Sequence, residues 1–193
     1  MAGGASIAVN SVAVDSQFNV YAGDDYSHVT KLDSNGKQVW QWTALAPVLS
    51  VGVDSNFNVY ASDYSNYVTK LDSNGKQVWQ WTAPDSVHSV AVDSQFNVYA
   101  GDASGQVTKL DSTGKQVWQW KAPNFVHSVA VDSQFNVYVS DNSNYVTKLD
   151  STGKQVWQWK APSVVYSVAV DSKFNVYAGD KSNYVTKLQT ANQ

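Results

Sequence analysis

The chain has 193 residues, of which 43% are apolar and 13% aromatic, so it has enough apolar side chains for a packed core and lacks the composition of a disordered protein. Its net charge is −3, and because every acidic residue is Asp and every basic residue is Lys, it has no arginine to bind phosphate or carboxylate through paired hydrogen bonds. It contains no cysteine, which excludes disulfides, thiolate metal sites and cysteine nucleophiles.

A repeated unit decides the architecture. The segment Val-Asp-Ser-x-Phe-Asn-Val-Tyr recurs with its Asp at positions 15, 54, 93, 132 and 171, which are 39 residues apart. The triplet Trp-Gln-Trp begins at 40, 79, 118 and 157, again 39 apart. The spacing indicates one domain over 1–193 with no linker. The units are expected at about 11–49, 50–88, 89–127, 128–166 and 167–193.

Each unit is expected to form four short strands in chain order. In the third unit they are 89–93, 97–102, 107–111 and 115–120, rich in β-branched and aromatic residues and separated by Ser, Asn, Asp and Gly. The fourth strand should end before Pro123, which cannot donate to a strand ladder. Apolar residues show no helical period. The unit therefore predicts a four-stranded antiparallel meander.

Such a meander has apolar residues on both faces and cannot bury them alone. Copies stacked around an axis would do so, which predicts an all-β propeller of about five blades. The alternative is an open stack of sheets, which would leave two broad apolar end faces exposed.

Two repeat families resemble this unit. The segment 89–102 (SVAVDSQFNVYAGD) and the segment 107–115 (VTKLDSTGK) resemble an NHL-type propeller repeat. The following Gln-Val-Trp resembles the tryptophan motif of PQQ-like repeats. The resemblance implies the propeller fold but no single function, because such folds host enzymes, binding modules and sensors. An NHL repeat would usually begin its third strand with Arg, so the resemblance does not imply phosphate or RNA binding for a chain with other residues there, namely Tyr67, Gln106, Tyr145 and Tyr184.

The last unit is incomplete. The first three strands occur five times, but the Trp-Gln-Trp strand occurs only four times. Met1–Gly4 lies in the register from which an N-terminal strand could complete the last blade, yet it contains poor strand formers. The sequence therefore predicts a last blade without its outer strand, with an edge that stays unpaired or pairs with another chain.

The candidate binding residues lie on one face of the predicted disc. The loops after the second strand and before the first strand differ in every unit, whereas the loops on the other face barely change. Variable loops on a rigid scaffold are where binding is expected, with drift at unrestrained positions as the alternative. The candidate ligand-binding residues are Tyr26, His28, Tyr64, Tyr67, His88, His127, Tyr145, Tyr166 and Tyr184.

No catalytic residue, metal ligand or cofactor site is predicted. The tryptophans are expected to wedge between neighbouring blades, and the aspartates at strand ends are expected to hold turns. His88 and His127 are in equivalent positions of adjacent units, but a shared metal would lack a third ligand. No Ser-His-Asp pattern or Gly-rich phosphate loop is evident.

The sequence thus favours a non-enzymatic repeat scaffold, amplified or engineered from one blade, whose main property is folding and assembly. The alternative is a lectin-like module with one weak glycan site per blade. Self-association through the open edge of the last blade is the expected partnership, and neither nucleic acid nor membrane is expected as a partner. The start of the chain lacks signal-peptide regions and no apolar run is long enough to span a bilayer, so a soluble protein of unknown location is expected.

Overall fold

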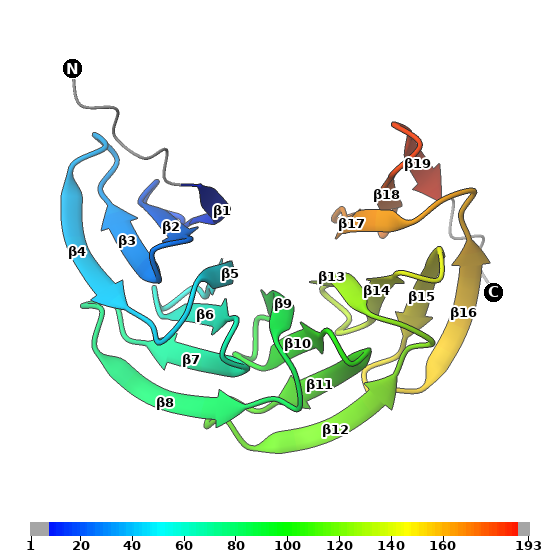
Figure 1. Cartoon of the computed structure of the whole chain (residues 1–193), viewed down its shortest axis with the longest axis horizontal. Coiled ribbons are helices and arrows are strands. Elements are labelled where there is room, and N and C mark those ends of the chain that lie inside the picture. The colour runs from blue at the N-terminus through cyan, green and yellow to red at the C-terminus, as the bar shows by residue number, and fades with distance from the viewer. Residues whose placement is uncertain (1–7, 189–193) are drawn as a thin grey trace.

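The computed structural model describes residues 8–188, and all regular structure in this range is β (Figure 1). Nineteen strands form five antiparallel sheets, of which four have four strands and the last has three. Within each sheet the strands follow chain order, so each sheet is a meander, here called a blade. The prediction of an all-β propeller with five blades, the last without its outer strand, is confirmed. Among the described residues no helix exists that could cross a bilayer.

The strands have nearly the same bounds in every blade. Blade 1 contains β1 (Val9–Val14), β2 (Val20–Asp24), β3 (His28–Leu32) and β4 (Gln38–Thr43). Blade 2 contains β5 (Val48–Val53), β6 (Val59–Asp63), β7 (Tyr67–Leu71) and β8 (Gln77–Thr82). Blade 3 contains β9 (Val87–Val92), β10 (Val98–Asp102), β11 (Gln106–Leu110) and β12 (Gln116–Lys121). Blade 4 contains β13 (Val126–Val131), β14 (Val137–Asp141), β15 (Tyr145–Leu149) and β16 (Gln155–Lys160). Blade 5 contains β17 (Val165–Val170), β18 (Val176–Asp180) and β19 (Val185–Leu188).

The predicted strands of the third unit match the structure to within two residues. The largest difference is at the first strand, which begins at Val87 instead of residue 89. The reason is a bulge, because the register shifts between Gly101 and Asp102 and Val87 then pairs with Asp102. Met1–Gly4 and the tail 189–193 lie outside the described residues, so the prediction about an N-terminal closing strand is not addressed by the structure.

The blades are arranged as an open arc around a central axis. The first strands β1, β5, β9, β13 and β17 lie on the inner side, and β4, β8, β12 and β16 form the outer rim (Figure 1). Neighbouring inner strands contact each other from β1 through to β17. Figure 1 shows an opening between blade 1 and blade 5, so the arc joins five blades through four junctions. Blade 1 and blade 5 therefore each have one face that no neighbouring blade of the described chain covers, a feature expected of the open-stack alternative.

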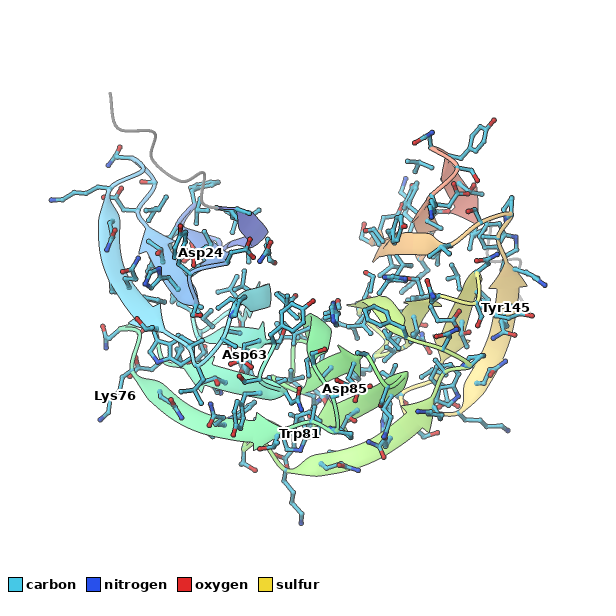
Figure 2. All side chains as sticks on the ribbon, in the orientation of Figure 1. Asp24, Asp63, Lys76, Trp81, Asp85 and Tyr145 are labelled. Carbon is cyan, nitrogen blue, oxygen red and sulfur yellow. The ribbon has the colours of Figure 1, made fainter. Side chains whose placement is uncertain are left out.

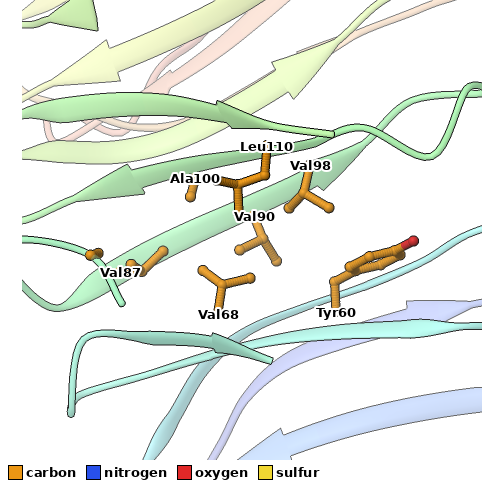
Figure 3. Packing of buried hydrophobic residues seen from close by; sticks show 8 residues of the cluster. Tyr60, Val68, Val87, Val90, Val98, Ala100 and Leu110 are labelled. Carbon is orange, nitrogen blue, oxygen red and sulfur yellow. The ribbon is translucent and has the colours of Figure 1, made fainter. Parts of the chain in front are cut away.

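Each junction buries the same set of side chains. Between blades 2 and 3, Tyr60 and Val68 of blade 2 pack against Val87, Val90 and Leu110 of blade 3 (Figure 3). All of these side chains are at most 7% exposed. Equivalent clusters join the other three pairs of blades. The core of the protein is thus a series of copied interfaces between sheets, as apolar residues on both faces of a blade require.

A polar contact of the inner strands repeats along with this packing. The backbone N–H of Val90 donates to Ser50 Oγ at 3.2 Å, and that of Val129 donates to Ser89 Oγ at 3.0 Å. The same bond links the first pair and the last pair of blades. These bonds satisfy backbone N–H groups of the inner strands and link each blade to the next.

The first tryptophan of the first three Trp-Gln-Trp strands reaches into the next blade, as predicted for a wedge. Trp79 Nε1 donates to the carbonyl of Ser112 at 3.1 Å, and its ring lies over Gly114. Gly114 has a φ of +84° and a Cβ there would lie 2.8 Å from Trp79 Cδ2, so a side chain is excluded both by conformation and by space. Trp40 and Trp118 make the equivalent contacts one blade earlier and one blade later.

Candidate functional site

A continuous row of aromatic rings runs across four blades on the variable loop face. It consists of Tyr64, His88, Phe125, His127 and Tyr166, and is called the aromatic row here. The successive ring centroids are 5.8, 4.4, 4.7 and 5.1 Å apart. These spacings and the tilted or edge-on angles between the rings are those of favourable aromatic pairs.

The row is built by two kinds of backbone position. His88, His127 and Tyr166 are the second residues of the inner strands β9, β13 and β17, whereas Tyr64 and Phe125 belong to the loops after β6 and before β13. Because the inner strands of adjacent blades contact each other, residues 39 apart in the chain become neighbours there. The loops supply the rings that close the gaps between them. The aromatic row therefore forms because neighbouring blades pack against each other.

Polar neighbours hold the two imidazoles of the row. His88 Nε2 lies 3.2 Å from Ser86 Oγ, and His127 Nε2 lies 3.2 Å from Asn142 Oδ1. Burial lowers the pKa of His88, and the proximity of His127 lowers it further. His88 is therefore a neutral ring at pH 7, and its surface is apolar with polar edges.

The ends of the row are the most accessible part. Tyr64 is 56% exposed and Tyr166 is 50% exposed, whereas both imidazoles are half-buried. A planar or apolar ligand could therefore contact the phenol rings at the two ends, with the imidazole edges between them. The arrangement provides rings for stacking and polar edges for hydrogen bonding.

The structure divides the predicted site residues into two groups. Tyr64, His88, His127 and Tyr166 come together in the aromatic row. Tyr67, Tyr145 and the equivalent His28 begin the third strands and pair with the outer strands. Tyr145 lies near the outer rim (Figure 2), with Lys160 Nζ 5.7 Å from its ring centroid. The strand-start residues are therefore not part of one surface with the row.

Besides Tyr67 and Tyr145, three predicted residues lie apart from the row, and His28 is one of them. Tyr26 is 50% exposed in the loop after β2, where its backbone N–H donates to Asp24 Oδ1 at 2.9 Å. His28 Nδ1 lies 3.4 Å from Asp24 Oδ2. Tyr184, immediately before β19, is 67% exposed on the last blade. These three residues lie on the first and last blades, and none of them belongs to the row.

Phe125 is the residue that sequence reasoning missed. Its equivalents in the other units are Ala8, Pro47, Ser86 and Val164, so the position is variable and lies in the loop before the first strand. That variability was the signal that could have identified it. Since the Phe125 ring contacts both His88 and His127, it also lies where a metal shared by the two imidazoles would have to bind. Over residues 8–188 no group of three His or Asp side chains is arranged as a metal ligand set.

The aspartates at the ends of the first strands hold turns, as predicted. Asp93 accepts hydrogen bonds from the backbone N–H groups of Gln95 and Asn97, from Asn97 Nδ2 and from the Tyr99 hydroxyl. The same four donors serve the equivalent Asp in the other blades, from the first to the last. Burial and the nearby Asp93 carboxylate raise the pKa of the Tyr99 hydroxyl, so Tyr99 acts as a donor. With its lone pairs so occupied, this carboxylate is structural.

In the three middle blades, the aspartates that end the second strands are more buried than those that end the first strands. Asp63 (Figure 2) and Asp141 are at most 3% exposed and each accepts bonds from two backbone N–H groups of the following loop. Burial raises the pKa of both carboxyl groups. They shape the variable loops and thereby position Tyr64 and Asn142, the neighbours of the two imidazoles.

Comparisons with known proteins address the family and the fold. The family model described as "Outer membrane protein assembly factor BamB" matches residues 4–120 and also residues 64–192, which together take in almost the whole chain. This match supports the PQQ-like part of the predicted resemblance, and the NHL-like part stays a prediction. No curated protein matches the sequence.

Many solved structures share the architecture, with 1443 matching chains, so the fold alone does not identify a function. One of them is the crystal structure of the WD40 β-propeller domain of Doa1, with a TM-score of 0.86 at 16% sequence identity. The alignment covers 95% of this chain but only 64% of that one. The five blades thus follow the curvature of a longer propeller chain, which agrees with the open arc.

Proposed function

The chain belongs to this BamB-type repeat family, and we propose that it is a non-enzymatic repeat scaffold amplified from one blade, whose main property is to fold and assemble. The observation that carries the proposal is the copying of the junctions. The same apolar cluster and the same Ser Oγ acceptor occur at all four junctions. Such a series is stable through nearest-neighbour contacts and needs no ligand.

Identity at exposed positions supports amplification. The outer strands carry a valine that is more than half exposed in every complete blade, namely Val39, Val78, Val117 and Val156, at 53–55% exposure. Packing does not require valine at such a position. Because core packing does not require this recurrence, it supports descent of the blades from one unit.

A lectin-like module is the second candidate, and the aromatic row favours it. Half-exposed tyrosines at both ends of the row are suited to stacking on a sugar ring. Against it, the row is a single feature with different residues in each blade. A multivalent lectin would instead repeat one pocket.

Glycan-array binding and thermal unfolding together distinguish the scaffold from the lectin-like module. For the scaffold we expect one cooperative unfolding transition without any ligand, and no sugar that binds tighter than about 1 mM, an affinity worth about 4 kcal/mol. A tighter sugar that is lost in both Tyr64→Ala and Tyr166→Ala would replace the scaffold with the lectin. Tyr145→Ala, which removes a tyrosine outside the row, is the matched control and should leave any such binding unchanged.

A further inference from the structure

The face of blade 1 that points into the opening is apolar and uncovered. Val9, Val12 and Val14 are 57%, 63% and 58% exposed. The residues equivalent to Val9 and Val12 in blades 2 to 5 are at most 7% exposed, because the preceding blade covers them. We call this surface of blade 1, which consists of Val9, Val12, Val14 and Phe18, the leading face. Phe18 is 73% exposed.

The face of blade 5 that points into the opening is the complementary surface. Val185 is 79% exposed, whereas its equivalents Val29, Val68, Val107 and Val146 are fully buried against the following blade. Tyr177 is partly exposed, although its equivalents in the other four blades are fully buried. We call the surface made by Tyr177, Val185 and Ser167 the trailing face.

The two faces are the halves of a junction that the chain already forms four times. In each junction the Tyr and Val of one blade pack against the first-strand valines of the next. The first strand's serine accepts a hydrogen bond from a valine N–H of the following blade. In the described part of the chain, Ser167 holds this acceptor position without a following blade, and Val12 holds the donor position without a preceding one.

We infer that the chain assembles head to tail, with the trailing face of one copy packed on the leading face of a second copy. This inference rests on the proposed scaffold function and names its partner and its surface. The contact is heterologous, because two different surfaces meet, so each copy keeps one free face of each kind for the next copy. Exposed apolar patches of this kind mark protein–protein contacts.

The last blade has the shape that such a joint needs. Figure 1 shows that the opening is narrower than the arc of five blades, so a whole second copy does not fit inside the same ring. The joint must therefore differ in geometry from the internal junctions. In those junctions the two Trp side chains of the outer strand wedge the blades apart at the rim. Blade 5 has no such strand among the described residues, so its joint can bring the two sheets closer to parallel.

Pairing through the β19 edge is a different contact. Two β19 edges would pair symmetrically, and the leading face of blade 1 would stay exposed in such a dimer. Packing of the end faces covers apolar surface on both partners, whereas edge pairing joins only backbone groups that water can otherwise satisfy. The two contacts also respond differently to substitution.

The test uses one charge on each face and measures mass against concentration by light scattering. The full chain should show a mass that rises above one copy with concentration. Val12→Asp and Val185→Asp should each weaken association at least about tenfold, because a carboxylate would be buried in an apolar joint. Val39→Asp, at a position 55% exposed on the outer strand β4, is the matched control and should associate like the unmodified chain.

A mixture of the two variants decides between the two contacts. Val12→Asp keeps a usable trailing face and Val185→Asp keeps a usable leading face, so an equimolar mixture should form a species of two copies and stop there. This restored pair also shows that the intact face of each variant is folded. A chain that is monomeric at all concentrations, single variants that associate as strongly as the unmodified chain, or a mixture that fails to pair although both variants unfold cooperatively would each overturn the inference. None of these outcomes bears on sugar binding, which tests the proposed function separately.

Discussion

The indole of Trp79 donates a hydrogen bond to the carbonyl of Ser112, 33 residues later in the chain, at 3.1 Å. Its ring covers Gly114, so one side chain joins the outer strand of blade 2 to the turn between the last two strands of blade 3. Gly36 occupies the same turn in blade 1, with a φ of +79°, and a Cβ at that position would have no neighbouring atom within 4 Å. Comparing the two glycines separates two reasons for glycine in this turn. Both have a positive φ, but only Gly114 also lacks the space for a side chain.

We expect Gly114→Ala to lower the free energy of unfolding by about 3 kcal/mol or more, because it adds overpacking against Trp79 to the cost of a left-handed alanine. Gly36→Ala should cost only about 1–2 kcal/mol, the conformational part alone. Urea unfolding of both variants gives the difference. Equal losses would show that the contact between Trp79 and Gly114 does not constrain the turn.

Two buried serines have hydroxyl groups without a hydrogen-bond partner among residues 8–188, Ser62 Oγ and Ser140 Oγ. We expect Ser62→Ala to raise the free energy of unfolding by about 1 kcal/mol, because an unsatisfied buried hydroxyl is removed and its carbon skeleton is kept. Ser140→Ala should do the same, and the double variant should be additive since the two residues lie in different blades.

Ser89→Ala is the control for these serines, because Ser89 Oγ accepts the N–H of Val129 at 3.0 Å. It should lower stability by about 1 kcal/mol, since a junction loses one hydrogen bond. Thermal unfolding in parallel gives the sign of each change. If Ser62→Ala and Ser89→Ala are both destabilising, the Ser62 hydroxyl has a partner that the geometry does not reveal.

The phenylalanine in the first turn of each blade has a positive φ, +65° at Phe18 and +67° at Phe96. Such a conformation is unfavourable for phenylalanine but tolerated by asparagine. Phe18 is 73% exposed, so we expect Phe18→Asn to raise the free energy of unfolding by up to about 1 kcal/mol through relief of strain. Chemical denaturation measures it.

Phe96→Asn relieves the same strain in blade 3 but removes a ring that is partly buried. It should therefore be neutral or destabilising. A stabilising Phe96→Asn would mean that the ring contributes nothing to blade 3, while a destabilising Phe18→Asn would mean that this ring is covered in solution, as it would be in a head-to-tail assembly.

Asp63 and Asp171 should give the protein opposite responses to pH. Burial raises the pKa of Asp63, so the folded protein binds the proton more tightly than the unfolded chain does. Its stabilising contribution is complete below the unfolded value of 3.8 and is lost as the pH rises through the folded pKa. We therefore expect Asp63→Asn to be more stable than the unmodified chain at pH 7, with a gain that disappears toward pH 4.

For Asp171 the hydrogen bond from the Asn175 side chain lowers the pKa to about 2. Its contribution is present above the unfolded value of 3.8 and is lost as the pH falls toward about 2. Asp171→Asn should thus be less stable than the unmodified chain at pH 7 and equal to it near pH 2. Unfolding curves from pH 2 to 7 test both variants, and parallel profiles for the two would contradict the assignment.

The sequence was sufficient to predict the structure within one blade. Val92, Asp93, Phe96 and Tyr99 lie within a few residues of each other, and strand propensity, turn chemistry and the 39-residue period all depend on such local order. The four strands of each complete blade, the turn role of Asp93 and the Trp wedge were therefore predictable. The variable loops also indicated that Tyr64, His88, His127 and Tyr166 lie on one face of the protein.

Only the tertiary structure decided what neighbours each copy has. Val12 and Val51 have the same local sequence pattern, yet Val12 is 63% exposed and Val51 is 6% exposed, because a blade precedes one and not the other. In the same way, Phe125 lies between two imidazoles while Tyr145 lies at the rim. Contacts between blades join residues about 39 positions apart, and they depend on how whole sheets dock and turn, which no local pattern of residues encodes.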